Sequence, residues 1–340
     1  MRFAHIVLAS TLLVPAAATM AADSVSQDTL RSAATRGLAL LEQTSPAFVK
    51  KGGCNSCHNQ MLPAAAQAFA RSRGVPTGDM FTQLSPEVSE QTTERYLEYS
   101  VGGGAGVAAL GLDLFGRALA NQPADARILS EIHFIKGMQE PAGNWHGGRD
   151  RRPPLTFDDF TPTAYMIFAL TKFVPAAETA DTNARIVRAR AWLTTATAER
   201  TQERAFRVLG LAWSNADRAT IQSAIRELRS LQAPDGGWSQ LPATSTDAYA
   251  TGMALYAMSV GGVPAGDPAY QAGLKYLLTT QAADGTWHVR TRALPFQPYF
   301  ESGYPYGHDQ WISAAGAAYA TLAIAAALDV PPSTAHGLAR

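Results

Sequence analysis

The sequence predicts an all-α protein folded as a six-hairpin α/α toroid, a ring of helical hairpins with buried inner helices. Three similar segments recur in the 340 residues. In each, a helical pattern ends in Gln and is followed by a turn and then by a Trp. Their tryptophans, Trp145, Trp238 and Trp287, are 93 and 49 residues apart, so the first gap is close to twice the second. A fixed period of this kind indicates stacked helical units. Helices that are apolar on most faces also alternate with helices that carry charge on one side.

Each recurring segment has the composition of a tight turn. The segments span 139–145, 232–238 and 281–287, and each has a Gly two residues before the Trp. Gly permits the left-handed backbone that ends a helix, the Trp can cover the preceding helix end, and the Gln can bond to exposed backbone groups. The wide first gap predicts a degenerate copy near 188–193, where Trp192 stands.

Extending this period in both directions gives six hairpins. Their second helices are expected to begin near Gln60, Gly106, Thr161, Gln202, Asp247 and Asp309. These helices are apolar on most faces, as in 164–170 and 314–320, which is typical of buried helices. The first helices carry charges on one side, as in 217–228, and are expected to face solvent. Six buried and six exposed helices favour a closed ring, although an open array of hairpins would show the same period.

Residues 1–22 have the features of a secretory signal peptide. Arg2 gives a positive start, an apolar run follows over 6–15, and small residues occupy 16–22. The run is too short to span a membrane, and we identify no later membrane span. The mature chain is therefore expected to be periplasmic or secreted, with 23–335 forming a single toroid domain.

The mature chain is close to electrically neutral. The whole sequence has 28 Lys and Arg and 28 Asp and Glu, and removal of Arg2 leaves 27 against 28, a net charge of −1. Nucleic acids and anionic membranes attract proteins that are rich in Lys and Arg. The composition therefore argues against both as partners.

The two cysteines of the chain, Cys54 and Cys57, have two residues between them, and His58 follows the second. In the C-x-x-C-H pattern of haem c attachment, each thiol adds across a vinyl group and the imidazole ligates the iron. We therefore predict one covalently bound haem c, with Cys54, Cys57 and His58 as its binding residues. Two alternatives remain open, a small disulfide or a zinc site with these three residues as ligands.

The C-x-x-C-H motif occupies the turn of the first hairpin. The exposed helix of this hairpin is expected over about 29–43 and its buried helix from Gln60, so the motif falls between them. His58 would then lie at the N-terminal end of the first buried helix, and all six buried helices begin at this end of the ring, the mouth. In a closed ring the sixth hairpin adjoins the first, and its loop 303–311 carries His308. We predict His308 as the second axial ligand of the haem iron, or as the remaining ligand of zinc.

The three Gln–turn–Trp segments and the buried second helices resemble those of the squalene-hopene cyclase and prenyltransferase superfamily. The resemblance covers about 30–330 and implies an α/α toroid, but it does not imply the family's activities. Class II terpene cyclases use an Asp-x-Asp-Asp acid, and the nearest segment here, 157–160, lacks the first Asp. Prenyltransferase β-subunits bind zinc through Asp, Cys and His near one mouth, whereas Cys54 and Cys57 are arranged differently.

Carboxylates at the mouth allow a different function. Asp159, Asp247 and Asp309 stand at the expected starts of buried helices, with Asp158 and Glu301 nearby. A glycosidase needs two carboxyl groups across a cleft, so these residues are candidate catalytic acids and bases. Acidic residues are also favoured at helix N-termini as caps, whatever the chemistry of the protein.

The sequence as a whole predicts an exported haem c protein that transfers electrons or carries out small-molecule redox chemistry at the mouth. If the protein is an enzyme, an oxidoreductase is favoured. Its partner would be a redox protein or a small-molecule ligand. The alternatives are a toroid with zinc or a disulfide at the motif that binds a ligand or a partner protein, and a hydrolase that uses the mouth carboxylates.

Overall fold

The computed structural model describes residues 24–53, 55–83, 93–99, 107–147, 153–155, 158–295 and 298–330. Cys54 and the expected signal peptide lie outside these ranges. The α-helices are α1 (Gln27–Gly52), α2 (Leu62–Ser72), α3 (Thr93–Leu97), α4 (Val107–Leu119), α5 (Ala126–Gly137), α6 (Phe160–Phe173), α7 (Thr179–Thr195), α8 (Thr201–Trp213), α9 (Arg218–Arg229), α10 (Ala248–Val260), α11 (Pro268–Thr280) and α12 (Gln310–Ala326). Shorter elements are the π-helical turn η1 (Cys57–Met61), the 3-10 turns η2 (Met80–Gln83), η4 (Ala176–Glu178) and η5 (Gly307–Asp309), and the antiparallel strands β1 (Trp238–Ser239) and β2 (Thr246–Asp247).

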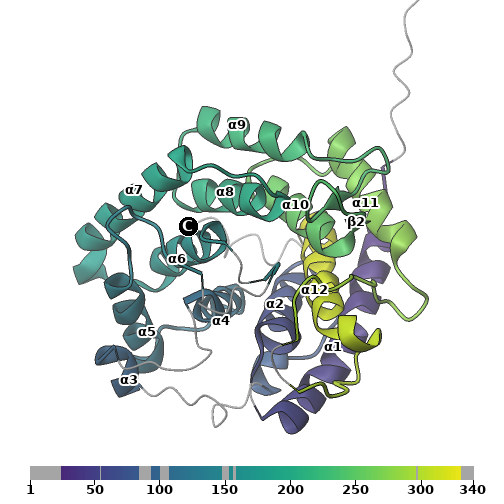
Figure 1. Cartoon of the computed structure of the whole chain (residues 1–340), viewed down its shortest axis with the longest axis horizontal. Helices are drawn as coiled ribbons and strands as arrows, with labels where there is room; N and C mark the ends of the chain where they lie inside the picture. Colours follow the sequence, from purple (N-terminus) through teal and green to yellow (C-terminus); the bar gives the residue numbers. More distant parts are fainter. Residues whose placement is uncertain are drawn as a thin grey trace, which may run out of the picture.

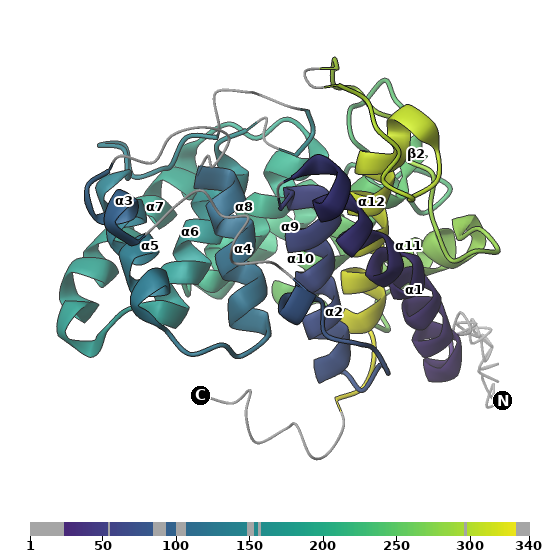
Figure 2. The same ribbon diagram turned by 90° about the horizontal axis from the view of Figure 1, so that it is seen from below.

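The helices form a closed ring of hairpins (Figure 1). The even-numbered helices line its inside, and each packs against the next, from α2 to α12. Because α12 also packs against α1 and α2, the sixth hairpin adjoins the first. A view turned by 90° shows the helices running alongside one another, with loops at either end (Figure 2). The predicted six-hairpin α/α toroid is therefore confirmed.

The inner helices begin close to their predicted positions. α4, α6, α8, α10 and α12 each start within one residue of the expected start, and α2 starts at Leu62 after the turn η1. These helices are buried on most faces, and α12 is buried at every residue from Gln310 to Ala325. Small residues allow this close packing, since a Cβ at Gly252 of α10 would overlap the backbone of α12 at Ala320.

The recurring Gln–turn–Trp segments tie neighbouring hairpins together. In each, the Gln side chain donates to the carbonyl of the turn glycine and to a carbonyl of the next outer helix. Gln139 thus reaches the Arg185 carbonyl of α7 at 3.0 Å. Each Trp indole N–H donates to the last turn of the preceding outer helix, as Trp145 does to the Ile135 carbonyl at 2.6 Å. The indole bonds satisfy carbonyl groups that helix ends leave unpaired, and the Gln bonds join each turn to the next outer helix.

The third segment closes the ring. Gln281 donates to the Ala33 carbonyl of α1 at 3.0 Å, and Arg36 of α1 donates to Gln281 Oε1 at 2.6 Å. Gly285 in the same turn has φ +88°, and a Cβ there would overlap the Arg36 carbonyl. The left-handed backbone and the missing side chain of Gly285 are both needed for α1 to pack on the last hairpin.

The first outer helix is longer than predicted, which corrects the expected end near residue 43. α1 continues through Pro46 to Gly52, so the C-x-x-C-H motif follows directly on a helix end. No glycine interrupts 44–51, and Lys50 and Lys51 suit the negative end of the helix dipole. Gly53 then ends the helix with φ +67°.

The degenerate copy expected near 188–193 lies within the outer helix α7. Trp192 packs there on Phe160 at 4.8 Å, and residues 196–200 lead directly into α8 without a Gly–Trp turn. This hairpin therefore keeps the repeat architecture without the motif.

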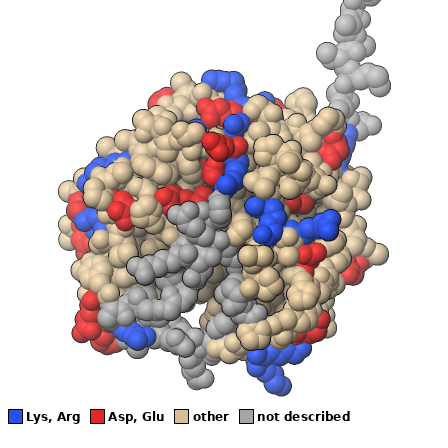
Figure 3. Space-filling model, in the orientation of Figure 1, with Lys and Arg blue, Asp and Glu red and all other residues tan. Residues whose placement is uncertain are grey.

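Acidic and basic side chains are interspersed over the face seen in Figure 3, in keeping with the near-neutral composition. Of the helices that the structure describes, none is long and apolar enough to cross a membrane.

Candidate functional site

A cleft opens at the mouth, between the first and last hairpins. Its lining residues come from α1, η1, η5, α12 and the described part of segment 291–300. They are Phe48, His58, Asn59, Thr291, Ala293, Leu294, Pro295, Pro298, Tyr299, Phe300, His308, Gln310 and Trp311. The volume of the cleft is about 140 Å³, and it is open to solvent. Ligand sites commonly measure about 300–1,000 Å³, so this mouth cleft is smaller than most.

Hydrogen bonds hold the C-x-x-C-H segment against α1. Gln60, which is fully buried, accepts from the backbone N–H and the hydroxyl of Ser56, both at 2.7 Å. The Gln60 amide donates in turn to the Ser45 carbonyl of α1 at 2.7 Å. Ser56 also caps η1 by accepting from the Asn59 N–H at 3.0 Å. These bonds place His58 at the N-terminal end of the first inner helix, as the sequence predicts.

Aromatic rings surround His58 in the mouth cleft. Its imidazole lies 5.3 Å from the Phe48 ring and 5.6 Å from the Trp311 ring, and the residue is 3% exposed. His308 lines the same cleft from η5 and packs on Tyr299 at 4.4 Å. The structure thus brings the two predicted axial residues to one cleft, one deeply buried and the other exposed.

The chemistry of the mouth cleft fits a haem c group. Cys57 directly precedes His58 in η1, and the walls of the cleft are largely aromatic and aliphatic, as in most cofactor sites. Asn59 adds a buried side-chain amide whose atoms have no partner among the described residues. Cys54 lies outside those residues, and within them no three His, Cys, Asp or Glu side chains gather closely enough to hold a metal ion. Zinc and disulfide therefore stay predictions, as does haem.

Two parts of the site, Asn59 and the segment 291–300, were not predicted from the sequence. Asn59 stands next to His58 in the sequence, and its burial without a side-chain partner is a property of the folded chain alone. The segment 291–300 has no helical period and no motif, and only its prolines indicate an extended loop. Both became visible as parts of the site because they line the mouth cleft.

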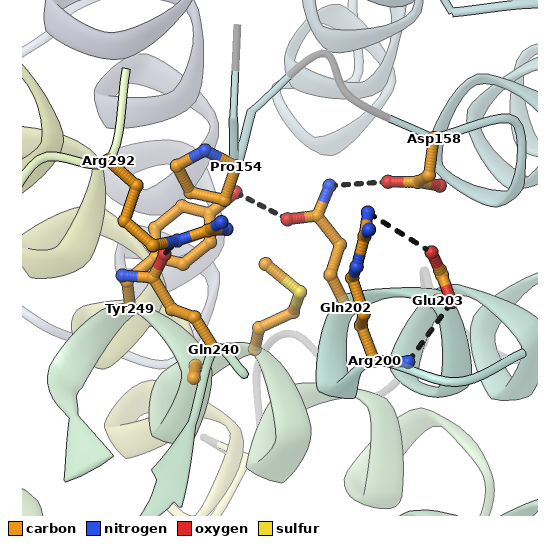
Figure 4. Close-up of a pocket in the computed structure, with 10 residues that line it drawn as sticks. Pro154, Asp158, Arg200, Gln202, Glu203, Gln240, Tyr249 and Arg292 are labelled. Carbon is orange, nitrogen blue, oxygen red and sulfur yellow. Dashed lines mark hydrogen bonds and ion pairs between the residues drawn. The ribbon is translucent and has the colours of Figure 1, made fainter. Parts of the chain in front are cut away.

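A smaller polar cavity lies at the N-terminal ends of α8 and α10 (Figure 4). Gln202 donates to Asp158 Oδ2 at 2.7 Å, and the Tyr249 hydroxyl donates to Gln202 Oε1 at 3.0 Å. Arg292, from segment 291–300, donates to Gln240 Oε1 at 2.7 Å. About 10 Å³ remains between these side chains, which is room for about one water molecule.

Two of the mouth acids cap inner helices. Asp158 accepts from the Thr161 N–H at 2.7 Å, and Asp247 accepts from the Ala250 N–H at 2.8 Å. Desolvation by burial raises the pKa of each carboxyl to about 6, although the cap hydrogen bonds act in the opposite direction. A raised pKa suits a proton donor, but the caps occupy the same oxygens, so a catalytic role for Asp247 stays a prediction.

Asp159 and Asp309 each pair with a histidine that follows a motif Trp. His146 Nδ1 lies 2.9 Å from Asp159 Oδ2, and His288 Nε2 lies 2.8 Å from Asp309 Oδ2. Both pairs are partly exposed at the mouth, and neither acid lines the mouth cleft. Their catalytic roles also stay predictions.

Arg204, at the start of α8, and Glu301, which was expected at the mouth, line neither cavity. Arg204 donates to the Glu227 carbonyl of α9 at 2.8 Å, and this contact directs it toward the outer layer. Glu301 is exposed and accepts a hydrogen bond from Tyr299 at the lip of the mouth cleft.

Asp247→Asn is expected to change how stability depends on pH. The pKa of Asp247 is about 6 in the folded chain against an ordinary 3.8, so between these values the folded state binds a proton that the unfolded state has released. The Asp247 carboxyl therefore contributes most to the free energy of unfolding of the wild type below pH 4, and this contribution declines toward pH 6. The stability difference between wild type and variant should fall by about 1 kcal/mol per pH unit across this window. Urea unfolding at pH 4, 5, 6 and 7 measures it.

The exposed cap Asp217 provides the control for this experiment. Thr220 hydrogen-bonds to the Asp217 carboxyl and lowers its pKa below the ordinary 3.8, so this carboxyl stays ionised across pH 4–7 and Asp217→Asn should give a difference that does not change with pH in this window. If the difference in the free energy of unfolding between wild type and Asp247→Asn does not change between pH 4 and 6, the carboxyl of Asp247 has an ordinary pKa and the prediction is wrong.

Aromatic side chains fill the interior of the ring. Tyr165, Phe206, Tyr249 and Tyr319 are at most 2% exposed, and the hydroxyls of Tyr165 and Tyr319 lie 3.0 Å apart. The inner helices thus pack on one another across the ring, and the larger described cleft lies at the mouth.

No protein-family profile and no curated protein matches the sequence, whereas solved structures match the fold. A variant of the type II terpene cyclase MstE from Scytonema, in complex with merosterolic acid A, matches with TM-score 0.55 and 14% identity over 89% of this chain and 98% of that chain. A protein from Actinoplanes matches with TM-score 0.57 and 15% identity over 88% and 100%. A glycosidase variant matches with TM-score 0.55 and 12% identity over 90% and 100%. At these identities the likeness shows the α/α toroid fold alone.

Proposed function

We propose that this toroid carries one covalently bound haem c at its mouth and serves electron transfer or small-molecule redox chemistry. One observation supports this most. His58, which completes the C-x-x-C-H motif, lines an aromatic cleft together with His308. Imidazoles are common axial ligands of haem iron, and apolar walls are one of the means by which a protein tunes the potential of the group.

The residues of the site have distinct roles in this proposal. Cys54 and Cys57 would hold the haem through thioether bonds, and His58 would ligate its iron. The rings of Phe48 and Trp311 pack against the imidazole and limit the access of water to it. When bound, the haem supplies one-electron redox chemistry.

The proposal includes export of the chain. Haem c attachment needs free thiols and haem on the exported side of the membrane, and residues 1–22 have the pattern of a signal peptide. A periplasmic or secreted location would place the mouth within reach of a redox protein or a small-molecule ligand.

Absorption spectra of protein exported together with haem c maturation machinery test the proposal. A sharp α-band after reduction with dithionite, and haem stain that persists on a denaturing gel, are expected. A colourless protein would rule out the haem c proposal. Zinc analysis and thiol counting would then decide between the metal and disulfide alternatives.

His308→Ala is expected to change the absorption spectrum from that of iron with two axial histidines to that of iron with one. The reason is that His308 lines the same cleft as His58. The haem stain on a denaturing gel should not change, because the thiols are intact. His288→Ala is the matched control, since His288 lies at the mouth, pairs with Asp309 and is not a lining residue of the cleft. A wild-type spectrum for His308→Ala would rule out His308 as an axial ligand.

A further inference from the structure

Two carboxyl groups are buried together where the second and third hairpins meet. Glu131 of α5 is fully buried, and Asp113 of α4 is 8% exposed. Each pairs with an arginine of its own helix, since Arg127 Nε lies 3.0 Å from Glu131 Oε1 and Arg117 Nε lies 2.6 Å from Asp113 Oδ2. The other oxygen of Glu131, Oε2, has no hydrogen-bond partner among the described residues. Buried polar atoms are normally paired, so an ionised Glu131 is incompletely compensated at this position.

The short outer helix α3 packs on α5 beside this acid pair (Figures 1 and 2). Its Tyr96 is 4% exposed, hydrogen-bonds to Arg127 and packs on the Phe134 ring at 5.6 Å. Tyr99, two residues after the helix, packs on the same ring at 5.8 Å and occupies the space that a Cβ at Gly137 would need. Tyr96 thus joins α3 to the arginine that pairs with Glu131, so α3 covers part of that ion pair.

The helix α3 depends on this docking for its structure. It has five residues, and isolated helices of this length are not stable in water. Undocking of α3 therefore means local unfolding of residues 93–97, and local openings of this kind need far less free energy than unfolding of the whole chain. A modest change in the free energy of docking is then enough to change how often α3 opens.

The charge on Glu131 makes such a change. Desolvation by burial, and then the nearby Asp113 carboxylate, raise the pKa of Glu131 to about 7, although Arg127 and Arg117 act in the opposite direction. The carboxyl thus gains or loses its proton near neutral pH. An ionised Glu131 regains water when α3 undocks, whereas in the docked state it stays buried beside a second carboxylate.

Apart from Tyr96, the other charged and titratable groups of the helices around Glu131 face elsewhere. The exposed ones are Glu94, Arg95, Glu98, Asp125, His133 and Lys172. Among the buried ones, Lys136 pairs with Glu178 and Asp181, and Tyr165 pairs with Tyr319. The ring of His133 lies 5.3 Å from that of Tyr99. Histidine is the side chain that ordinarily titrates near neutral pH, so the experiment has to separate His133 from Glu131.

We propose that Glu131 is a pH-sensitive latch for α3. The protonated side chain keeps α3 docked on α5, and loss of the proton loosens α3. The docked state binds the proton more tightly than the open state. Docking is therefore strongest at low pH and weakens as the pH rises from about 4.5, the ordinary pKa of Glu, to about 7. The latch does not depend on the proposed haem, because none of its residues lines the mouth cleft.

Amide hydrogen exchange of the full-length protein at pH 5, 6, 7 and 8 tests the latch. The measured quantity is the protection of residues 93–99, which is the ratio of the intrinsic to the observed exchange rate at each pH. Protection is expected to fall about 5- to 10-fold for each pH unit from pH 5 to 7, and about 2-fold from pH 7 to 8. Constant protection from pH 5 to 8 overturns the inference.

The outer helix α9 is the reference for local opening. Residues 93–99 should exchange faster than α9 at every pH, because α3 opens without unfolding of the rest of the chain. Equal protection of the two segments would show that α3 opens only when the whole chain unfolds, and it would overturn the inference.

Glu131→Gln keeps the size of the side chain and an oxygen that accepts from Arg127, but it cannot ionise. Protection of residues 93–99 in this variant is expected to be nearly independent of pH and about 10- to 100-fold above that of wild type at pH 8. A pH dependence like that of wild type overturns the inference. Glu227→Gln is the matched control, since it makes the same change in an ion pair, with Arg207 at 2.9 Å, and should keep the wild-type profile over 93–99.

His133→Gln separates the histidine from the latch. This variant should keep the fall in protection with rising pH, because Glu131 is intact. Loss of the fall would assign the pH dependence to His133 and overturn the inference. If Glu131→Gln does not fold, the profiles of wild type and His133→Gln still decide, since a fall that both retain supports the latch and its loss in either overturns it.

Discussion

The double variant Cys54→Ala, Cys57→Ala is expected to lose covalent haem completely. The chain has two cysteines, so without them no thioether can form and no stain should remain on a denaturing gel. Each single variant is expected to keep part of the stain, because one thioether can still form. The measured quantity is haem stain per mole of protein exported with maturation machinery.

Asn55→Ala is the control for this loss. It changes a residue between the two cysteines and leaves both thiols and His58 in place, so its stain should match that of wild type. A double variant that stains like wild type would contradict attachment through this motif. Absence of stain from every variant and from wild type would contradict haem c itself.

Gly285→Ala is expected to destabilise the fold by about 3–5 kcal/mol, at the upper end of single substitutions. Two costs combine at this position. The backbone has φ +88°, which is unfavourable for alanine, and the new Cβ would overlap the Arg36 carbonyl of α1. The ring would have to open at the junction of its first and last hairpins to relieve the overlap. Urea unfolding and thermal melting measure the loss.

Gly262→Ala separates these two costs. Gly262 has φ +89°, but a Cβ there would meet no atom within 4 Å. Its substitution should cost only about 1–2 kcal/mol for the left-handed backbone. If both variants lose the same free energy of unfolding, the close approach of Gly285 to α1 adds no cost, and the prediction is wrong.

Much of the fold could be predicted because three of the hairpins repeat the same local chemistry. Gln, Gly and Trp occur at fixed offsets because they act together at one turn. The Gln bonds to the turn and to the next outer helix, and the Trp bonds to the preceding outer helix. Closure of the ring could not be derived from such offsets. It depends on the bond from Gln281 to Ala33, which joins segments at opposite ends of the sequence.

The site was predicted in part for the same reason. His58 and His308 both stand at the start of an inner helix, so the repeat places them at one end of the ring, and α2 and α12 are neighbours. The end of α1 was misjudged because Gln43 matches the Gln at which the helical pattern of the other hairpins ends, whereas α1 continues through Pro46 to Gly52. The unpaired amide of Asn59 depends on the whole surroundings of that side chain, which no local pattern describes.

The mouth cleft is assembled from the two ends of the chain. Synthesis begins at the N-terminus, so the segment with Cys57 and His58 is made long before the segment with His308 and Trp311. Until α12 docks beside α1 and α2, one wall of the cleft does not exist and the motif stays open to other proteins. Attachment of the proposed haem would therefore take place on the exported, partly folded chain, and arrival of the last hairpin would enclose the finished site.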